Sequence, residues 1–202
     1  MKMGGYLFNY FSSDLHLGHI NIIKYCKRPF DDVNEMNDYL IKKWNERVKE
    51  EDTVFYLGDF CFKTGQEGIG LSAKEYINKL NGNIIFVSGN HDKNNSLKTI
   101  INSIIITIAK KRILLIHNPI DLFKIPKYEN VVDFVFCGHV HEKWKVRLKG
   151  QFKHKNKTNK IPIINVGVDM WNFHPIKFEE INKEFYKTAG RCAKQQNVEP
   201  EN

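Results

Sequence analysis

Polar side chains that can bind metal ions follow the ends of five apolar runs in this chain, and this pattern constrains the fold more than any other feature. The runs are typical of buried β-strands, because they are rich in β-branched and aromatic residues. In open α/β sheets the carboxyl ends of the strands form the crevice where ligands bind. The pattern therefore predicts an α/β fold in which five strand ends converge on one site, which would contain Asp14, His16, Asp59, Asn90, His91, His117, His139 and His141.

The rest of the chain is expected to form strands and helices with no internal repeat and no second domain. Strands are expected at residues 6–11, 53–57, 84–87, 104–108, 113–116, 131–136, 143–149 and 161–168. One helix should follow a cap at Asp31 or Asp32, because apolar residues then recur every three or four positions. A Ser72–Glu75 capping box predicts a second helix that ends near Asn81, and a last helix is expected at 178–186.

Composition and length are those of an ordinary globular protein. The chain has 202 residues, of which 42% are hydrophobic and 27% are charged, and this excludes a collagen-like chain or a membrane bundle. We expect one domain at residues 1–187 and a polar, frayed tail at 188–202. No apolar run reaches the roughly 18 residues of a membrane span, and the first residues lack a secretory signal. The four cysteines show no CxxC spacing, so we expect free thiols in a cytoplasmic protein without a membrane partner.

Each residue of the candidate site also has a structural explanation when it is taken alone. Asn90 could form a turn, and His117 could be a hydrogen-bonded histidine at a strand end. The pair His139 and His141 is a stronger signal, because alternate residues of an extended segment point the same way and imidazole is a favoured metal ligand. Five clusters at five strand ends favour a metal site over independent coincidences. Oxygen and nitrogen donors without a thiolate favour manganese, iron or zinc over copper(I) or an iron–sulfur cluster.

In order along the chain, the clusters read D-L-H at 14–16, G-D at 58–59, G-N-H-D at 89–92, a lone histidine at 117 and G-H-V-H at 138–141. This set resembles the calcineurin-like metallophosphoesterases, whose motifs are D-x-H, G-D, G-N-H-D/E, H and G-H-x-H. The resemblance spans residues 6 to about 176, and the flanking segments look like those of a compact bacterial and phage branch. It implies a four-layer α/β/β/α sandwich of two mixed sheets with helices outside.

The resemblance also implies a set of metal ligands. Asp14, His16 and His141 would bind one divalent ion, Asn90, His117 and His139 would bind a second, and Asp59 would bridge the two. Manganese is the expected ion in vitro, with iron, zinc or nickel as alternatives. Two divalent ions outweigh the two aspartates, so an anion is the expected ligand of the site. Such a pair of ions can lower the pKa of a shared water, which then attacks a phosphate ester in line.

His91 and Asp92 are the candidate catalytic residues. In the family, the histidine that matches His91 protonates the leaving group or binds a phosphoryl oxygen, and the alternative is that His91 only caps a turn. Asp92 could orient His91 or cap a following helix, and both interpretations stay open. The protein phosphatase branch has a further aspartate where this chain has Phe62, which argues against the detailed mechanism of that branch.

Three other side chains are candidates for binding the substrate. His19 could contact the substrate phosphate or cap the segment before Ile22. Arg28 could also contact the phosphate, although a lone arginine is more often a solvated or paired surface group. Lys143 is the first basic residue after the last candidate ligand, so it would lie near a phosphate bound at the site.

A basic segment at residues 142–160 separates two hypotheses about the substrate. It holds eight lysines and arginines against the single acid Glu142, a local charge of 8 − 1 = +7. Alternating charged and apolar residues at 143–149 predict a strand with one wet face. The segment either attracts a phosphate-bearing partner or is a solvated hairpin. The first hypothesis is therefore a hydrolase of a small phosphate monoester or diester, such as a nucleotide, and the second is a nuclease. A catalytically silent scaffold is a third, which the complete set of ligands opposes.

Overall fold

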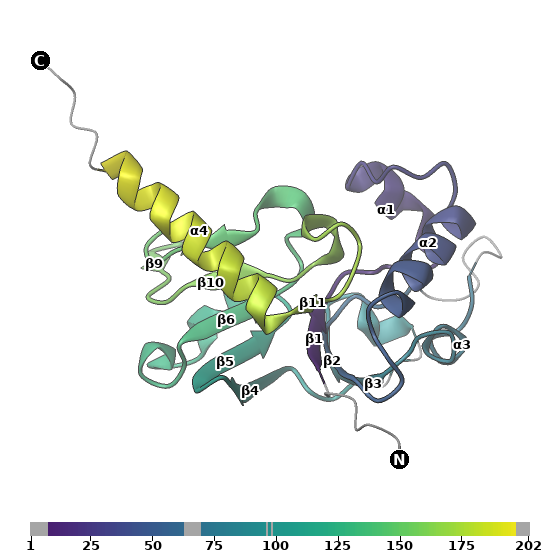
Figure 1. Cartoon of the computed structure of the whole chain (residues 1–202), viewed down its shortest axis with the longest axis horizontal. Helices are drawn as coiled ribbons and strands as arrows, with labels where there is room; N and C mark the ends of the chain where they lie inside the picture. Colours follow the sequence, from purple (N-terminus) through teal and green to yellow (C-terminus); the bar gives the residue numbers. More distant parts are fainter. Residues whose placement is uncertain (1–7, 63–69, 96, 98, 197–202) are drawn as a thin grey trace, which may run out of the picture.

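The computed structural model describes residues 8–62, 70–95, 97 and 99–196, and two mixed β-sheets pack face to face at its centre (Figure 1). The first sheet has three parallel strands and one antiparallel edge strand, in the order β11 (Ile176–Lys177), β1 (Asn9–Ser12), β2 (Thr53–Leu57) and β3 (Asn83–Val87). The second sheet has three parallel strands between two antiparallel edge strands, in the order β4 (Ser103–Ile108), β5 (Lys111–Ile116), β6 (Phe134–Cys137), β10 (Ile163–Asn165) and β7 (Val146–Arg147).

The core between the sheets is built from apolar side chains that both sheets contribute. The Phe11 ring of β1 meets the Phe136 ring of β6 edge to face, with 5.0 Å between the ring centroids. Leu57 and Val87 of the first sheet and Leu115 of the second are buried in the same cluster. Burial of such side chains is the main favourable contribution to folding. The α/β architecture of two mixed sheets that the family resemblance implies is confirmed.

Three helices cover the outer face of the first sheet: α1 (Ile20–Tyr25), α2 (Val33–Asn45) and α3 (Ala73–Ile77). Asp32 is the N-cap of α2, and its carboxylate accepts hydrogen bonds from the backbone N–H groups of Asn34 and Glu35. The predicted capping box of Ser72 and Glu75 is present at the start of α3. This helix ends at Ile77, before the predicted end near Asn81, and the next residues form turns in which the N–H groups of Lys79 and Leu80 bond to carbonyls three positions earlier.

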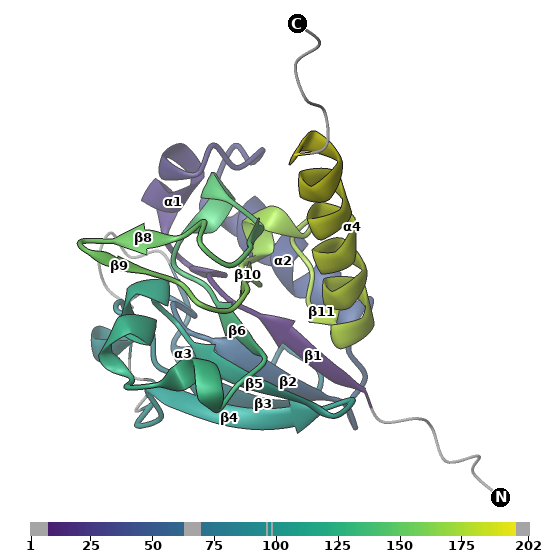
Figure 2. The ribbon, with the colours of Figure 1, turned by 90° about the vertical axis from the view of Figure 1, so that its left-hand side faces the viewer.

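The outer face of the second sheet is covered by short 3-10 helices, η2 (Pro119–Lys124) and η3 (Tyr128–Asn130), a segment for which the sequence analysis predicted no element. Helix α4 (Phe178–Gln196) lies across the edge of the sandwich, and its residues Phe178 and Ile181 reach the core between the sheets (Figures 1 and 2). The helix continues past its predicted end at residue 186. Residues 188–196, expected to be frayed, are therefore helical, and residues 197–202 lie outside the described part of the chain.

The strand predicted at residues 143–149 is wrong for most of its length. Residues His141–Lys143 form the 3-10 helix η4, and only Val146 and Arg147 belong to a strand, β7. The amine of Lys145 lies 4.1 Å from the centroid of the Trp171 ring, and the Arg147 guanidinium lies over the Trp144 ring. Long basic side chains can cover apolar surface in this way, so the alternation of charge did not mark one wet face.

Further along the basic segment, a short hairpin pairs β8 (Lys153–His154) with β9 (Lys157–Thr158). It projects from the body of the protein beside the 3-10 helices of the second sheet (Figure 2). The structure describes all four cysteines, and each has a free thiol as predicted. Among the residues that the structure describes, no helix has the length and apolar character needed to cross a membrane.

Candidate metal centre

The structure brings the seven candidate metal ligands together at the carboxyl ends of the central strands. Asp14 follows β1, Asp59 follows β2 and Asn90 follows β3, all in the first sheet. His117 directly follows β5 of the second sheet, and the segment with His139 and His141 follows β6. Because the two sheets face each other, their strand ends lie on opposite sides of one site. The ligands fall into two groups joined by Asp59.

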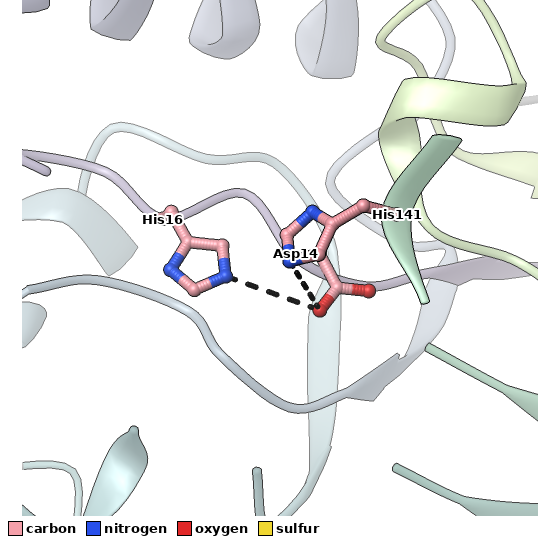
Figure 3. A group of neighbouring side chains, drawn as sticks. All are labelled: Asp14, His16 and His141. Atoms are coloured by element: carbon pink, nitrogen blue, oxygen red, sulfur yellow. Dashed lines mark ion pairs between the residues drawn. The ribbon is translucent and has the colours of Figure 1, made fainter. Parts of the chain in front are cut away.

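The first group consists of Asp14, His16 and His141 (Figure 3). Oδ1 of Asp14 lies 4.0 Å from Nε2 of His16 and 4.0 Å from Nε2 of His141. Asp14 is fully buried, and its carboxylate accepts hydrogen bonds from the Ser13 hydroxyl at 2.7 Å and from the backbone N–H of His139 at 2.9 Å. These contacts hold the carboxylate in place between two imidazoles.

The second group consists of Asp59, His117, His139 and Asn90. Oδ1 of Asn90 lies 3.0 Å from Nε2 of His117 and 2.9 Å from Nδ1 of His139. Nδ1 of His117 donates a hydrogen bond to the backbone carbonyl of Leu57 at 2.7 Å. This bond leaves the lone pair of Nε2 for the site, as a metal ligand requires.

Asp59 lies between the two groups. Its Oδ2 is 3.6 Å from Nε2 of His16 and 3.3 Å from Nε2 of His117. Its Oδ1 accepts a hydrogen bond from the backbone N–H of His91 at 2.9 Å, which fixes the plane of the carboxylate. One oxygen of Asp59 therefore faces an imidazole of each group, which is the geometry of a bridging ligand.

The residues present fit a pair of divalent metal ions. Nε2 of His16 is fully buried and has no hydrogen-bond partner among the described residues. A buried nitrogen without a partner costs free energy, and a metal ion at this point would supply the missing partner. The surrounding donors are carboxylate and amide oxygens and imidazole nitrogens, which suit manganese, iron and zinc.

The backbone of the site is strained in a way that the sequence does not reveal. Five of the seven candidate ligands have left-handed φ angles, at Asp14 (61°), His16 (51°), Asp59 (57°), His139 (69°) and His141 (46°). Such conformations cost about 1 kcal/mol or more each and gather at functional sites. At Gly138 the backbone lies so close to Ser13 and Asp14 that no side chain fits. A Cβ there would lie 1.9 Å from the Ser13 hydroxyl and 2.5 Å from Oδ2 of Asp14.

The electrostatics of the protein without metals follow from these distances. Burial lowers the pKa of His16 well below its ordinary value, so this imidazole is neutral and free to bind a cation. Burial alone would raise the pKa of Asp59, but His117 and His16 outweigh it and keep this carboxyl ionised. The same pairing raises the pKa of His117 to about 9 against the opposing effect of burial. Contact with Asp169 raises the pKa of His141 to about 10, again against the effect of burial.

Asp169 is a residue of the site that the sequence analysis missed. It lies in the 3-10 helix η5 (Val168–Met170), and its Oδ2 is 2.9 Å from Nδ1 of His141. A carboxylate on the outer nitrogen of a ligating histidine fixes its tautomer and its ring orientation. No ligand motif contains this aspartate, so only its position in the segment NVGVDMWNF, which follows a predicted strand, could have pointed to it.

Arg28 occupies a different place from the one expected of a substrate contact. It is buried, and its guanidinium donates two hydrogen bonds to Asp169, at 2.8 and 3.1 Å. It also donates to the backbone carbonyls of Leu15 at 2.8 Å and Asp14 at 2.7 Å. Arg28 therefore ties the first motif to the loop that orients His141, and it braces the site from behind.

The other candidate residues surround the mouth of the site. The exposed His91 ring lies 5.5 Å from the His16 ring, measured between centroids. His19 is the N-cap residue of α1 without a side-chain cap bond, and its ring stacks on Phe62 at 4.3 Å. Burial and the nearby His91 lower the pKa of His19 to about 4. Lys143 is exposed at the end of η4, two residues after His141.

Asp92 binds the backbone of neighbouring loops. Its carboxylate accepts hydrogen bonds from the backbone N–H groups of Asp59 and Gly89, at 2.9 and 2.8 Å, and from Phe60 at 3.0 Å. The Asn95 side chain donates a further bond at 2.7 Å. Asp92 thus holds the loops after β2 and β3 against each other and sets the position of Asp59.

Comparisons with known proteins cover all five motif clusters. Residues 11–174 match the family model of the calcineurin-like phosphoesterase superfamily domain. An uncharacterized protein of Methanocaldococcus jannaschii is 35% identical over 174 residues, which are 86% of this chain and 89% of that protein. The Gene 66 protein of Mycobacterium phage L5 is 35% identical over 83 residues, 41% of this chain and 39% of that protein. A solved structure of a protein of unknown function from Aquifex aeolicus has a TM-score of 0.65 and 28% identity, and the match covers 88% of this chain and 99% of that one.

Proposed function

Because the chain belongs to the calcineurin-like phosphoesterase superfamily, we propose that it hydrolyses a small phosphate monoester or diester, such as a nucleotide, with two divalent metal ions. Metal-dependent hydrolysis of phosphate esters is the general activity of the family. The observation that carries the two-ion proposal is the position of Asp59, whose Oδ2 lies within 3.6 Å of His16 and 3.3 Å of His117. No other carboxylate of the described residues faces an imidazole of both groups at such distances.

The ligand residues would hold the ions as the sequence analysis expects. Asp14, His16 and His141 would bind one ion, and Asn90, His117 and His139 would bind the other. When bound, two divalent ions activate a water and neutralise the charge of the phosphoryl oxygens. We propose manganese as the working ion in vitro, with iron, zinc or nickel as alternatives.

We propose that His91 acts on the substrate itself. Its backbone N–H is bonded to Asp59, which keeps the residue beside the site, while its ring is exposed and lies next to the His16 ring. We therefore assign it the transfer of a proton to the leaving oxygen, a role worth about 10² to 10⁴ in rate. Asp92 contributes by positioning, since its carboxylate binds the backbone of the two loops that carry Asp59 and His91.

The proposal is tested by reconstituting the metal-free protein with manganese, measuring bound metal, and assaying p-nitrophenyl phosphate and bis-p-nitrophenyl phosphate. We expect two ions per chain, hydrolysis of at least one ester, and loss of hydrolysis in EDTA. One bound ion or none, with hydrolysis intact, would contradict the two-ion mechanism. Absence of hydrolysis at full metal loading would instead favour a silent scaffold with the same fold.

A nuclease remains the second candidate, and one observation favours it. Lysines and aromatic rings gather on the β8–β9 hairpin and the neighbouring 3-10 helix η2, close in the chain to the candidate ligands. A nucleic-acid backbone is a phosphate diester, so the same metal centre would serve both candidate functions.

A further inference from the structure

A groove outside the metal centre runs between the 3-10 helix η2 and the β8–β9 hairpin. It consists of two adjoining hollows of about 390 and 440 Å³. Phe123, Asn156 and Lys157 line both hollows, so the two form one continuous feature, which we name the hairpin groove. Figure 2 shows the hairpin projecting along this side of the second sheet. Hollows of this size each admit about one nucleotide-sized ligand.

The hairpin groove carries a net positive charge. Five lysines line the two hollows against one acid, Glu129; they are Lys124, Lys127, Lys155, Lys157 and Lys160. Lys124 forms an ion pair with Asp121, and Lys160 forms one with Glu129. The other three have exposed side chains and no carboxylate partner among the described residues. Lys157 also donates a hydrogen bond to the backbone carbonyl of Phe123 at 2.8 Å. Exposed cations without a carboxylate partner, spaced along a groove, suit an extended polyanion, which can contact several of them at once.

Aromatic rings form a ladder beside these lysines. The rings of Phe123 and Phe152 are 5.9 Å apart between centroids with an angle of 4° between their planes, and the His154 ring lies 6.3 Å from Phe123 at 15°. The Trp144 ring adjoins Phe152 at 5.8 Å. All four side chains are only partly buried. Phe123 and His154 line the groove, whereas Phe152 and Trp144 pack against the core behind them, with Trp144 tilted by 53° to Phe152. Near-parallel rings such as Phe123 and His154 beside a cationic groove are the elements that bind unpaired bases in single-stranded nucleic acids.

Both walls of the hairpin groove start at candidate metal ligands. The helix η2 begins at Pro119, directly after the His117-Asn118 pair, and carries Phe123. The other wall leaves the site at His141 and passes through Lys143 and Trp144 before it reaches the hairpin. The chain therefore passes from the loops that carry His117 and His141 into the two walls of the groove.

We propose that the hairpin groove binds single-stranded nucleic acid and guides its phosphate backbone to the metal centre. This inference rests on the proposed function for the reaction, and it identifies the class of substrate. A duplex would keep its bases stacked and out of reach of the ladder. A membrane surface would favour aromatic side chains that protrude, whereas Phe123 and His154 line a groove between two elements.

Binding can be measured without catalysis. Fluorescence anisotropy of a labelled 20-nucleotide oligo-dT, titrated with the full chain in EDTA at several salt concentrations, should show saturable binding that weakens as salt rises. The double variant Lys155→Gln with Lys157→Gln removes two unpaired cations. Its binding should be about tenfold weaker at 0.15 M salt, and the slope of log K against log salt should fall by about 1.4, since each single-strand phosphate contact contributes about 0.7. Phe123→Leu, which keeps the apolar volume, should weaken binding roughly fivefold or more with an unchanged slope.

The matched control is Lys110→Gln with Lys111→Gln in the β4–β5 hairpin. Lys110 and Lys155 both occupy left-handed turn positions, with φ angles of 63° and 52°. Lys111 and Lys157 are exposed strand residues one and two positions further along the chain, and Lys111 lies 3.6 Å from the Asp133 carboxylate. The control should bind oligo-dT as the unchanged protein does.

Four outcomes would overturn the proposal: no binding of oligo-dT, equal weakening in the control, equal affinity for duplex DNA, or preference for anionic phosphatidylserine vesicles. Hydrolysis of bis-p-nitrophenyl phosphate separates this proposal from the proposed function. If the ester is hydrolysed and oligo-dT does not bind, only the groove proposal fails; if oligo-dT binds and no ester is hydrolysed, the proposed function fails.

Discussion

The substitution Arg28→Met distinguishes a structural brace from a substrate contact. The structure places the Arg28 side chain at 0% exposure, with four hydrogen bonds to Asp169 and to the carbonyls of Asp14 and Leu15. Methionine keeps much of the apolar volume and removes every one of these donors. Asp169, whose side chain is 3% exposed, would then keep its charge with only His141 as a partner. Breaking a buried pair by removing one partner costs about 3 to 5 kcal/mol.

The matched control for this variant is Arg47→Met. Arg47 also makes several polar contacts, with Glu180 at 2.7 Å, His174 at 2.8 Å and the Pro175 carbonyl at 3.0 Å, but the side chains of Arg47 and Glu180 are 26% and 37% exposed. Exposed pairs contribute about 0 to 1 kcal/mol, so the control should lose much less stability. A chain of this size loses about 2 to 4 °C in Tm per kcal/mol. We therefore expect Arg28→Met to melt roughly 6 to 20 °C lower than the unchanged protein, and Arg47→Met to melt within about 4 °C of it.

Urea unfolding and thermal melting, both in EDTA, measure this difference in stability. KM is measured separately, from steady-state hydrolysis of bis-p-nitrophenyl phosphate at a temperature where both variants are folded. If Arg28 has a structural role, Arg28→Met should lose much stability and should bind the ion held by His141 more weakly, because the contact of Asp169 with His141 is then less well fixed. A substrate contact predicts the opposite pattern. If Arg28→Met were as stable as Arg47→Met and only its KM rose, the structural assignment of Arg28 would be refuted.

Three further outcomes test the site. Asp59→Asn should reduce both metal binding and hydrolysis more than Asn90→Ala, because Asp59 faces both groups and Asn90 faces one; equal residual activity would remove the bridge. His91→Ala should keep both ions and slow hydrolysis about 10² to 10⁴-fold, most for esters with basic leaving groups, and loss of metal in this variant would make His91 a ligand. The pKa values of His117 and His141 are raised to about 9 and about 10, so protonation of these groups stabilises the metal-free fold most below pH 6.5. The free energy of unfolding, measured with urea in EDTA, should therefore fall from pH 7 through pH 10. A flat profile would contradict these shifts.

The strands and the ligand clusters were predictable because their signals are local. An apolar run such as 53–57 is long enough for a strand, and the Gly58-Asp59 pair directly after it marks the strand end. The α2 cap and the Ser72 capping box were predictable for the same reason. Where the signal was not local, the prediction failed. The charges at 143–149 alternate as in an exposed strand, but Lys145 covers Trp171, and the sequence shows no sign of that contact.

The brace behind the site shows this limit most clearly. Arg28 and Asp169 are 141 positions apart, and neither belongs to a ligand motif. Their pairing depends on β10 and η5 returning the chain beside β1, a step that is set by the whole sheet order. A lone arginine in the sequence is correctly expected to be solvated or paired, and only the fold shows which of these holds.

The strained backbone and the facing lone pairs of the site have a common physical meaning. Five ligands hold left-handed φ angles. Oxygens of Asp59 and Asn90 also face imidazole nitrogens, so that lone pairs face one another where no proton lies between them. Both features cost free energy in the metal-free chain, and the raised pKa of His117 shows that a proton there offsets part of this cost. Divalent ions would offset this free-energy cost more completely, since each ion binds several oxygen and nitrogen ligands at once. The sheets therefore hold the ligands in an arrangement whose cost is compensated by bound cations, which explains why so many unusual conformations gather at these five strand ends.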